Sequence, residues 1–261
     1  MKKLLGIISL AMSVILTSIS ICSCAAMKTH WMKEDERARF LAEESDKQID
    51  RDKFHCTYYI TVSVDYKGEK YTKRLEYTEY YDAKNSENVK YKIVQKVNEL
   101  EGVASSYTYV NGTLYISSGN DKIQGIFDNL DQAYYHIPYY NIYYDIQSYA
   151  YVTCPQISDG KYVAKYTHTS SEAKSNMYSY LYWAVPERIY TEMYACQFVD
   201  EFTYNKDYRL TQYKTHIDLK PRNAADKGYV SIDFKQILHY NDFSITEPKD
   251  ADEYRSLIDP I

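Results

Sequence analysis

The sequence predicts an α+β fold: one domain built on a curved antiparallel β-sheet, with helices packed on one side of it. Three observations point to this class. Several stretches alternate apolar and polar residues and are separated by short turns, other stretches have apolar residues at helical spacing, and no low-complexity linker divides the strands into two groups. Hydrophobic residues make up 45% and charged residues 26% of the 261 residues, which excludes collagen-like and broadly disordered classes.

The N-terminus has the pattern of an exported lipoprotein. Two lysines precede an apolar run over residues 4–21 whose end carries small polar residues, as in a secretory signal. Cys24 has Ile21 at position −3 and Ser23 at −1, which resembles a bacterial lipobox with a lipidated cysteine. Cys22 fits this pattern poorly, because the large Ile21 would then occupy position −1.

We therefore predict a lipoprotein signal peptide over residues 1–23, a tether over 24–32 and a single domain over 33–261. The mature chain would be attached to the outer face of the bacterial membrane, in the cell envelope, through a diacylglyceryl group on Cys24. Two alternatives stay open: an ordinary signal peptide cut near Ala25 or Ala26, and an uncleaved anchor.

Charge and cysteine usage narrow the function classes. A formal charge of −5 argues against a nucleic-acid partner, which requires a cationic surface. Cys56, Cys154 and Cys196 leave open whether a disulfide forms, and they are best interpreted as half-buried strand residues. Because no cysteine or histidine has metal-ligand spacing to another, the sequence predicts no metal and no cofactor.

The first half of the domain is predicted as one helix followed by an antiparallel meander. Apolar spacing indicates a helix over residues 31–48. Alternation predicts strands over 56–66 and 71–81, a third around 89–97, and a hairpin over 107–116. The hairpin has the clearest local signal, because Asn111-Gly112 tolerates the positive φ angles of a type I′ turn.

The second half of the domain is predicted to contain two helices with a strand between them, followed by three further strands. A helix is expected over 121–134, a strand over 162–168, and a second helix that opens at 169–172 and ends before Pro186. Strands are expected over 190–204, 208–219 and 229–240. Eight tyrosines fall within 134–151, a stretch with no assigned element.

This order of elements resembles the LolA/LppX-like lipoproteins of bacterial envelopes. The likeness rests on the lipobox at Cys24, on the hairpin at 109–115 followed by a predicted helix, and on the C-terminal segment 243–254. It implies a half-barrel sheet with helices across its concave face, and an apolar cavity between them that holds acyl chains in characterised relatives.

The chain carries 32 tyrosines but only 7 phenylalanines. A buried phenol needs a hydrogen-bond partner, so we expect exposed or cavity-lining tyrosines more than core tyrosines. Tyrosine platforms for sugars, tyrosines lining an amphipathic cavity, and simple β-propensity on solvated strand faces are three interpretations that stay open.

No catalytic signature such as GxSxG, HExxH or a Walker loop occurs, so we do not expect an enzyme. Two functions follow. The first is the binding of an acyl-lipid ligand in a cavity lined by one face of the first strand and covered by the helix over 121–134, with these lining residues: Tyr58, Ile60, Val62, Val64, Ile126, Phe127 and Leu130. The same residues also fit an ordinary sheet–helix core. The alternative is a surface module that uses a Tyr-rich patch to bind an envelope protein or a glycan.

Overall fold

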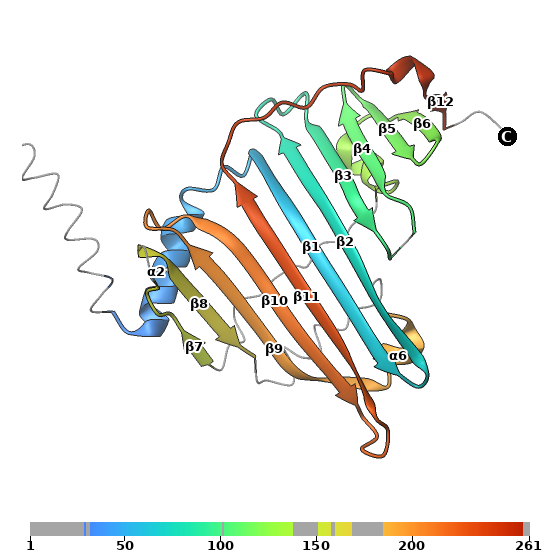
Figure 1. Cartoon of the computed structure of the whole chain (residues 1–261). Coiled ribbons are helices and arrows are strands. Elements are labelled where there is room, and N and C mark those ends of the chain that lie inside the picture. Colours follow the sequence, from blue (N-terminus) through green and yellow to red (C-terminus); the bar gives the residue numbers. More distant parts are fainter. Residues whose placement is uncertain are drawn as a thin grey trace, which may run out of the picture.

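A computed structural model describes residues 29, 32–100, 102–137, 151–157, 160–168 and 185–257. The described strands form a single large curved sheet of 12 strands in the order β12-β6-β5-β4-β3-β2-β1-β11-β10-β9-β8-β7 (Figure 1). The sheet is not closed, since β12 and β7 lie at its two edges. The predicted curved antiparallel sheet is therefore confirmed.

The N-terminal strands form a meander in which every neighbour is antiparallel. Its members are β1 (Lys53–Tyr66), β2 (Glu69–Asp82), β3 (Lys90–Asn98), β4 (Ser105–Val110), β5 (Thr113–Ser118) and β6 (Asp121–Ile126). The two-residue turns Lys67-Gly68 and Asn111-Gly112 have positive φ at both positions, as a type I′ hairpin requires. The predicted hairpin at 107–116 is thus confirmed.

The C-terminal strands form a second antiparallel series. Its members are β7 (Tyr151–Thr153), β8 (Tyr162–Thr167), β9 (Met193–Tyr204), β10 (Leu210–Pro221) and β11 (Gly228–His239). The last strand, β12 (Arg255–Ser256), pairs with β6 in parallel.

The pairing of β1 with β11 joins the two series into one sheet. It runs without a shift from His55 opposite His239 to Tyr66 opposite Gly228. Both strands are central, so each is paired along both of its edges.

The two faces of this sheet differ in chemistry. We call the face that bears the even-numbered side chains of β1, Cys56 to Tyr66, the core face, and all six of these residues are buried. Buried residues of β2, β11 and β10 on the same face belong to one cluster with them, which also includes residues of β3, β4, β5 and β9. The other side, which we call the opposite face, bears the odd-numbered residues of β1.

In the part of the chain that the structure describes, three α-helices pack around the sheet. Helix α2 (Glu34–Asp46) buries Ala38 and Leu41 against residues of β8 at one edge, as the sequence predicts for 31–48. Helix α3 (Leu130–Tyr134) and helix α6 (Glu187–Tyr190) contribute Leu130, Ala133 and Ile189 to the main cluster. That helices cover the concave face stays a prediction, because the helix expected over 169–186 lies almost wholly outside the described residues.

The helix predicted over 121–134 is wrong in its first half, where β6 pairs with β5 from Asp121 to Ile126. Ile126 and its neighbours satisfy helical spacing only by coincidence. Gly119-Asn120 forms a two-residue hairpin loop, and Gly119 has φ +59°, which suits the first position of a type II′ turn. Helix formation is delayed to Asn129, whose side chain accepts a hydrogen bond from the backbone of Gln132 and so caps α3.

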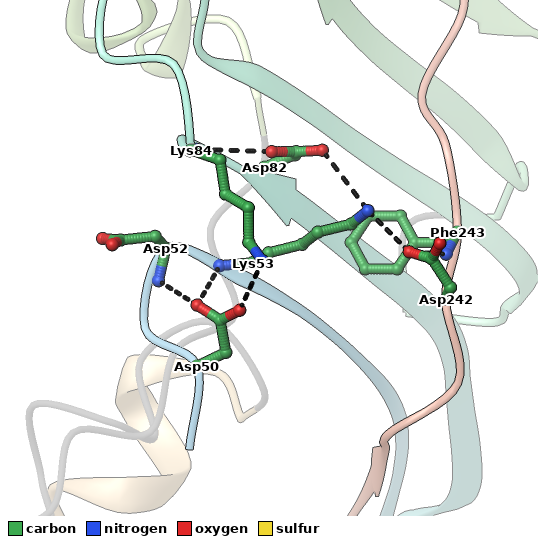
Figure 2. Close-up of polar contacts among 7 residues, drawn as sticks. All are labelled: Asp50, Asp52, Lys53, Asp82, Lys84, Asp242 and Phe243. Carbon is green, nitrogen blue, oxygen red and sulfur yellow. Dashed lines mark hydrogen bonds and ion pairs between the residues drawn. The ribbon is translucent and has the colours of Figure 1, made fainter. Parts of the chain in front are cut away.

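The C-terminal segment runs as a strap across the ends of the N-terminal strands (Figure 1). Lys53 lies between two carboxylates, with Nζ 2.7 Å from Asp242 and 3.8 Å from Asp82, and its ammonium is 4.9 Å from the ring centroid of Phe243 (Figure 2). Further along, the ammonium of Lys122 on β6 pairs with Asp250, which directly precedes the short 3-10 helix η3 (Ala251–Glu253), and with Glu253 within that helix. These contacts place β12 at the edge of β6.

Gly228, at the end of the β1–β11 pairing, allows a direct test of that junction. A Cβ at this position would lie 2.3 Å from the backbone oxygen of Asp65, whereas one at Gly102 would meet nothing within 4 Å. Both glycines have positive φ, +136° and +97°, so Gly102→Ala is a matched control for backbone strain. We expect Gly228→Ala to lower the free energy of unfolding by about 1–3 kcal/mol more than Gly102→Ala in urea titrations. Equal losses would show that this strand end is not tightly packed.

Candidate functional site

The predicted lining residues of β1 all project from the core face. Tyr58, Ile60, Val62 and Val64 are between 0% and 8% exposed. Across β11 they lie opposite Gln236, Phe234, Ile232 and Val230 in turn, and across β2 Ile60 lies opposite Leu75. The described side chains place them in one packed cluster, and their role in lining a ligand cavity stays a prediction.

The three residues predicted to cover the cavity lie in different surroundings. Leu130 on α3 is buried in the same cluster as the β1 residues. Phe127 is partly buried against that cluster, and its ring lies over Gly125, where an added Cβ would approach it to 2.8 Å. Ile126 is 84% exposed at the end of β6 and cannot cover the core face, so this assignment is corrected.

Tyrosines enter the core more often than expected. Eleven of the described tyrosines are buried: Tyr58, Tyr66, Tyr77, Tyr91, Tyr109, Tyr115, Tyr162, Tyr166, Tyr204, Tyr213 and Tyr254. The expectation of exposed or cavity-lining tyrosines did not anticipate these buried ones, whereas other described tyrosines, such as Tyr135 and Tyr151, are exposed. For Tyr58, Tyr91 and Tyr213, carboxylates on inward-facing strand positions supply the acceptors that buried phenols need.

Glu79 on β2 is the first of these carboxylates. The hydroxyls of Tyr58 and Tyr91 each donate to it at 2.8 Å, and Gln236 donates to the Tyr58 oxygen at 3.1 Å. Desolvation raises the pKa of Glu79 above its usual value of 4.5, and the two tyrosine hydrogen bonds oppose this only in part. The same burial, together with the Glu79 charge, raises the pKa of both tyrosines, so their hydroxyls stay protonated donors.

Asp200 on β9 is the second carboxylate, and it is fully buried. Its Oδ1 accepts hydrogen bonds from Tyr213 at 2.9 Å and Thr215 at 2.6 Å, while its Oδ2 lies 2.5 Å from Nε2 of His168. The ring of His168 stacks on Phe198 with centroids 4.0 Å apart. The hydroxyl and the imidazole thus converge on one acid, whereas in a hydrolytic triad the imidazole lies between hydroxyl and acid.

The sequence analysis missed both carboxylates. The Glu79 side chain projects to the same face of β2 as Leu75 and Tyr77. On β9, Asp200 projects to the same face as Phe198 and Phe202. An acidic residue at an inward position of an alternating strand is the signal that could have identified them.

Other candidate chemistry is limited in the described part of the chain. No group of three or more metal-ligating side chains occurs there, and Cys56, Cys154 and Cys196 are all free thiols. Burial raises the pKa of Cys56 to about 12 and of Cys154 to about 11, so these thiols are protonated and weakly nucleophilic. The two buried cysteines are more buried than predicted.

The predicted lipid anchor lies outside the part of the chain that the structure describes. Cys24 and the apolar run before it are outside the described residues, so lipidation stays a prediction. Among the residues that are described, no helix has the length and apolar character to cross a membrane.

Comparisons with known proteins give matches at the level of structure. No family model and no curated protein matches the chain. LprF from Mycobacterium bovis is 14% identical, with 83% of this chain and 99% of that chain covered and a TM-score of 0.37. A DUF1329 family protein from Desulfovibrio piger is 9% identical, with 78% and 92% covered and a TM-score of 0.24.

A third solved structure, an outer membrane lipoprotein-sorting protein domain from Vibrio parahaemolyticus, is 8% identical, with 80% of this chain and 93% of that chain covered and a TM-score of 0.25. All three TM-scores lie below 0.5 and all three identities below 25%. The proposals below therefore rest on the residues of this chain.

The raised pKa of Glu79 gives stability a defined pH dependence. Stability contributed by a carboxyl with a raised pKa is fully present below its unfolded value, about 4.5, and is lost as the pH rises through its folded value. Glu79→Gln keeps the shape and an acceptor but cannot ionise. Relative to the wild type, we expect the free energy of unfolding of Glu79→Gln to rise between pH 4 and pH 8. The rise should be about 1.4 kcal/mol for each unit by which folding raises the pKa of Glu79.

Urea titrations at several pH values measure this difference. Glu87→Gln, in an exposed loop, removes the same charge and is the control. Parallel stability curves for the wild type and Glu79→Gln would contradict the assignment of Glu79 as a desolvated acid.

Proposed function

We propose that the chain is an extracytoplasmic lipoprotein, anchored by Cys24 to the outer face of the membrane, that binds a hydrophobic, lipid-like ligand on the core face and catalyses no reaction. The observation that carries this proposal is the continuous layer of buried apolar side chains on the core face. It extends over four adjacent central strands, with these aliphatic and aromatic residues: Leu75 on β2, Ile60, Val62 and Val64 on β1, Val230, Ile232 and Phe234 on β11, and Ile217 and Leu219 on β10.

Binding to such a surface needs no directed chemistry. Each buried methylene of an acyl chain contributes about 0.8 kcal/mol, so about ten methylenes contribute about 8 kcal/mol before the costs of association. The carboxylates of Glu79 and Asp200 hold the tyrosines that border this surface in fixed positions. We infer a structural role for both acids, because each is satisfied by hydroxyl donors of the core itself.

The alternative function, a surface module for an envelope protein or a glycan, is supported by the residues that flank the Tyr-rich stretch. Tyr135 is 91% exposed and Tyr151 is 62% exposed. Between these two tyrosines, residues 138–150 lie outside the described residues. Exposed phenols stack on sugars and bury well at protein interfaces.

The anchor can be tested with two cysteines that lie two residues apart. Cys24→Ser removes the predicted lipidation site, so we expect the protein to accumulate as the uncleaved precursor and to incorporate no labelled palmitate. Cys22→Ser, the matched control, is expected to be processed and labelled normally, because Cys22 does not fit the lipobox. Labelling of Cys24→Ser, or loss of labelling in Cys22→Ser, would move the anchor to another residue.

The ligand face can be tested with neighbouring residues of β1 that project to opposite sides. Val62→Thr keeps the side-chain shape but adds a hydroxyl to the core face, whereas Ser63→Ala changes the opposite face. Because an unpaired buried hydroxyl costs about 1–3 kcal/mol, we expect Val62→Thr to weaken binding of a fluorescent fatty acid roughly 5- to 150-fold. Ser63→Ala should leave the affinity unchanged.

Circular dichroism and urea titration of both variants separate affinity from folding. If Val62→Thr lowers stability but binds the fatty acid like the wild type, Val62 belongs only to the packed core and the lipid-binding proposal loses its main support.

A further inference from the structure

The opposite face of the sheet contains a groove that the lipid-binding proposal does not use. It crosses β1, β11, β10, β9 and β8 and has a volume of about 530 Å³. Ligand pockets of small molecules occupy about 300–1,000 Å³. The groove spans the β1–β11 pairing that joins the two halves of the sheet, and the five strands beneath it are neighbours in the sheet order.

Two lysines lie side by side at the centre of this groove. Lys214 on β10 is directly opposite Lys235 on β11. Directly opposed residues on antiparallel strands have Cβ atoms about 5 Å apart, and like charges in this arrangement destabilise a sheet. A sheet that keeps such a pair carries a concentrated positive charge at this point.

The carboxylates near these lysines are engaged with other groups. Glu201, the neighbour of Lys214 on β9, forms an ion pair with Lys165 at 3.4 Å. Asp233, two residues before Lys235, accepts from Nδ1 of His216 at 2.8 Å. Among the described residues, no carboxylate forms an ion pair with Lys214 or Lys235.

The remaining walls add donors and an aromatic surface. Desolvation alone would lower the pKa of His216, but hydrogen bonds to Asp233 and Asp218 outweigh it and raise the pKa, which adds positive charge below neutral pH. The ring of Tyr59 lies under the Lys235 ammonium, with Nζ 4.4 Å from the ring centroid. Thr61 offers a hydroxyl on the same wall.

We propose that this groove is a binding site for the phosphate group of a small anionic ligand, separate from the core face. Lys214 and Lys235 would contact the phosphate oxygens as two point charges, while Tyr59 and the buried Val199 contact the uncharged part of the ligand. Lysine ammoniums bind phosphate oxygens as point charges, and no arginine is among the described residues that line the groove. The volume fits a phosphoester of a polyol or the headgroup of a glycerophospholipid.

Calorimetry of the full mature chain with glycerol phosphate tests this site. We expect saturable binding at one site by the wild type and affinity at least tenfold weaker in the double variant Lys214→Gln/Lys235→Gln. Lys220→Gln is the matched control, because Lys220 is an exposed lysine on the same face of the same strand but outside the groove. Its affinity should stay within twofold of the wild type.

A folding defect should not explain the loss of affinity. Because the double variant removes two like charges that lie opposite each other, it should be at least as stable in urea as the wild type. Two further probes distinguish the ligand sources. Lysine-dependent binding of glycerol phosphate supports a soluble phosphoester, and lysine-dependent binding confined to phosphatidylglycerol vesicles, with none to phosphatidylcholine vesicles, supports a lipid headgroup. The proposal is overturned if neither probe depends on Lys214 and Lys235, or if glycerate, which carries a carboxylate in place of the phosphate, binds equally well.

Discussion

The structure depends on the antiparallel pairing between β1 and β11. These strands are separated by most of the chain, yet they pair in one register from His55–His239 to Tyr66–Gly228. Without this pairing the N-terminal meander and the C-terminal series would be two sheets, and β1 and β11 would each be an unpaired edge strand. With it, the apolar residues of both series lie on one continuous face, and the polar residues of both series form the groove on the other.

A second constraint arises from the composition of the core. A tyrosine buries as much apolar surface as a phenylalanine, but its hydroxyl must be satisfied. Here the solution is to place an acid among the phenols, Glu79 for Tyr58 and Tyr91, and Asp200 for Tyr213. Such networks are directional, so they fix ring positions more strictly than apolar packing alone. A core face ordered in this way can present a defined surface to a flexible ligand.

Local patterns in the sequence were sufficient for the long strands and for the Asn111-Gly112 turn, because a sheet with one buried face imposes a period of two and a type I′ turn imposes its residues. They failed at 121–126, where short apolar spacing fits helix and strand equally, and Ile126 was consequently assigned to the wrong side of the site. The pairing of distant strands has no local signal. Glu79 and Asp200 were missed because an acid is ordinarily solvated, and only tertiary packing buries these two.

Native mass spectrometry of the domain from residue 28 onward, which lacks Cys24 and is purified from a bacterial host without detergent, tests the central claim most directly. If the core face binds lipid, the spectrum should show the protein with an acyl lipid at near-unit stoichiometry, and mild activation should release that lipid. A protein that is purified without lipid, and still carries none after incubation with envelope lipids, would contradict the account and leave the core face as packed interior alone.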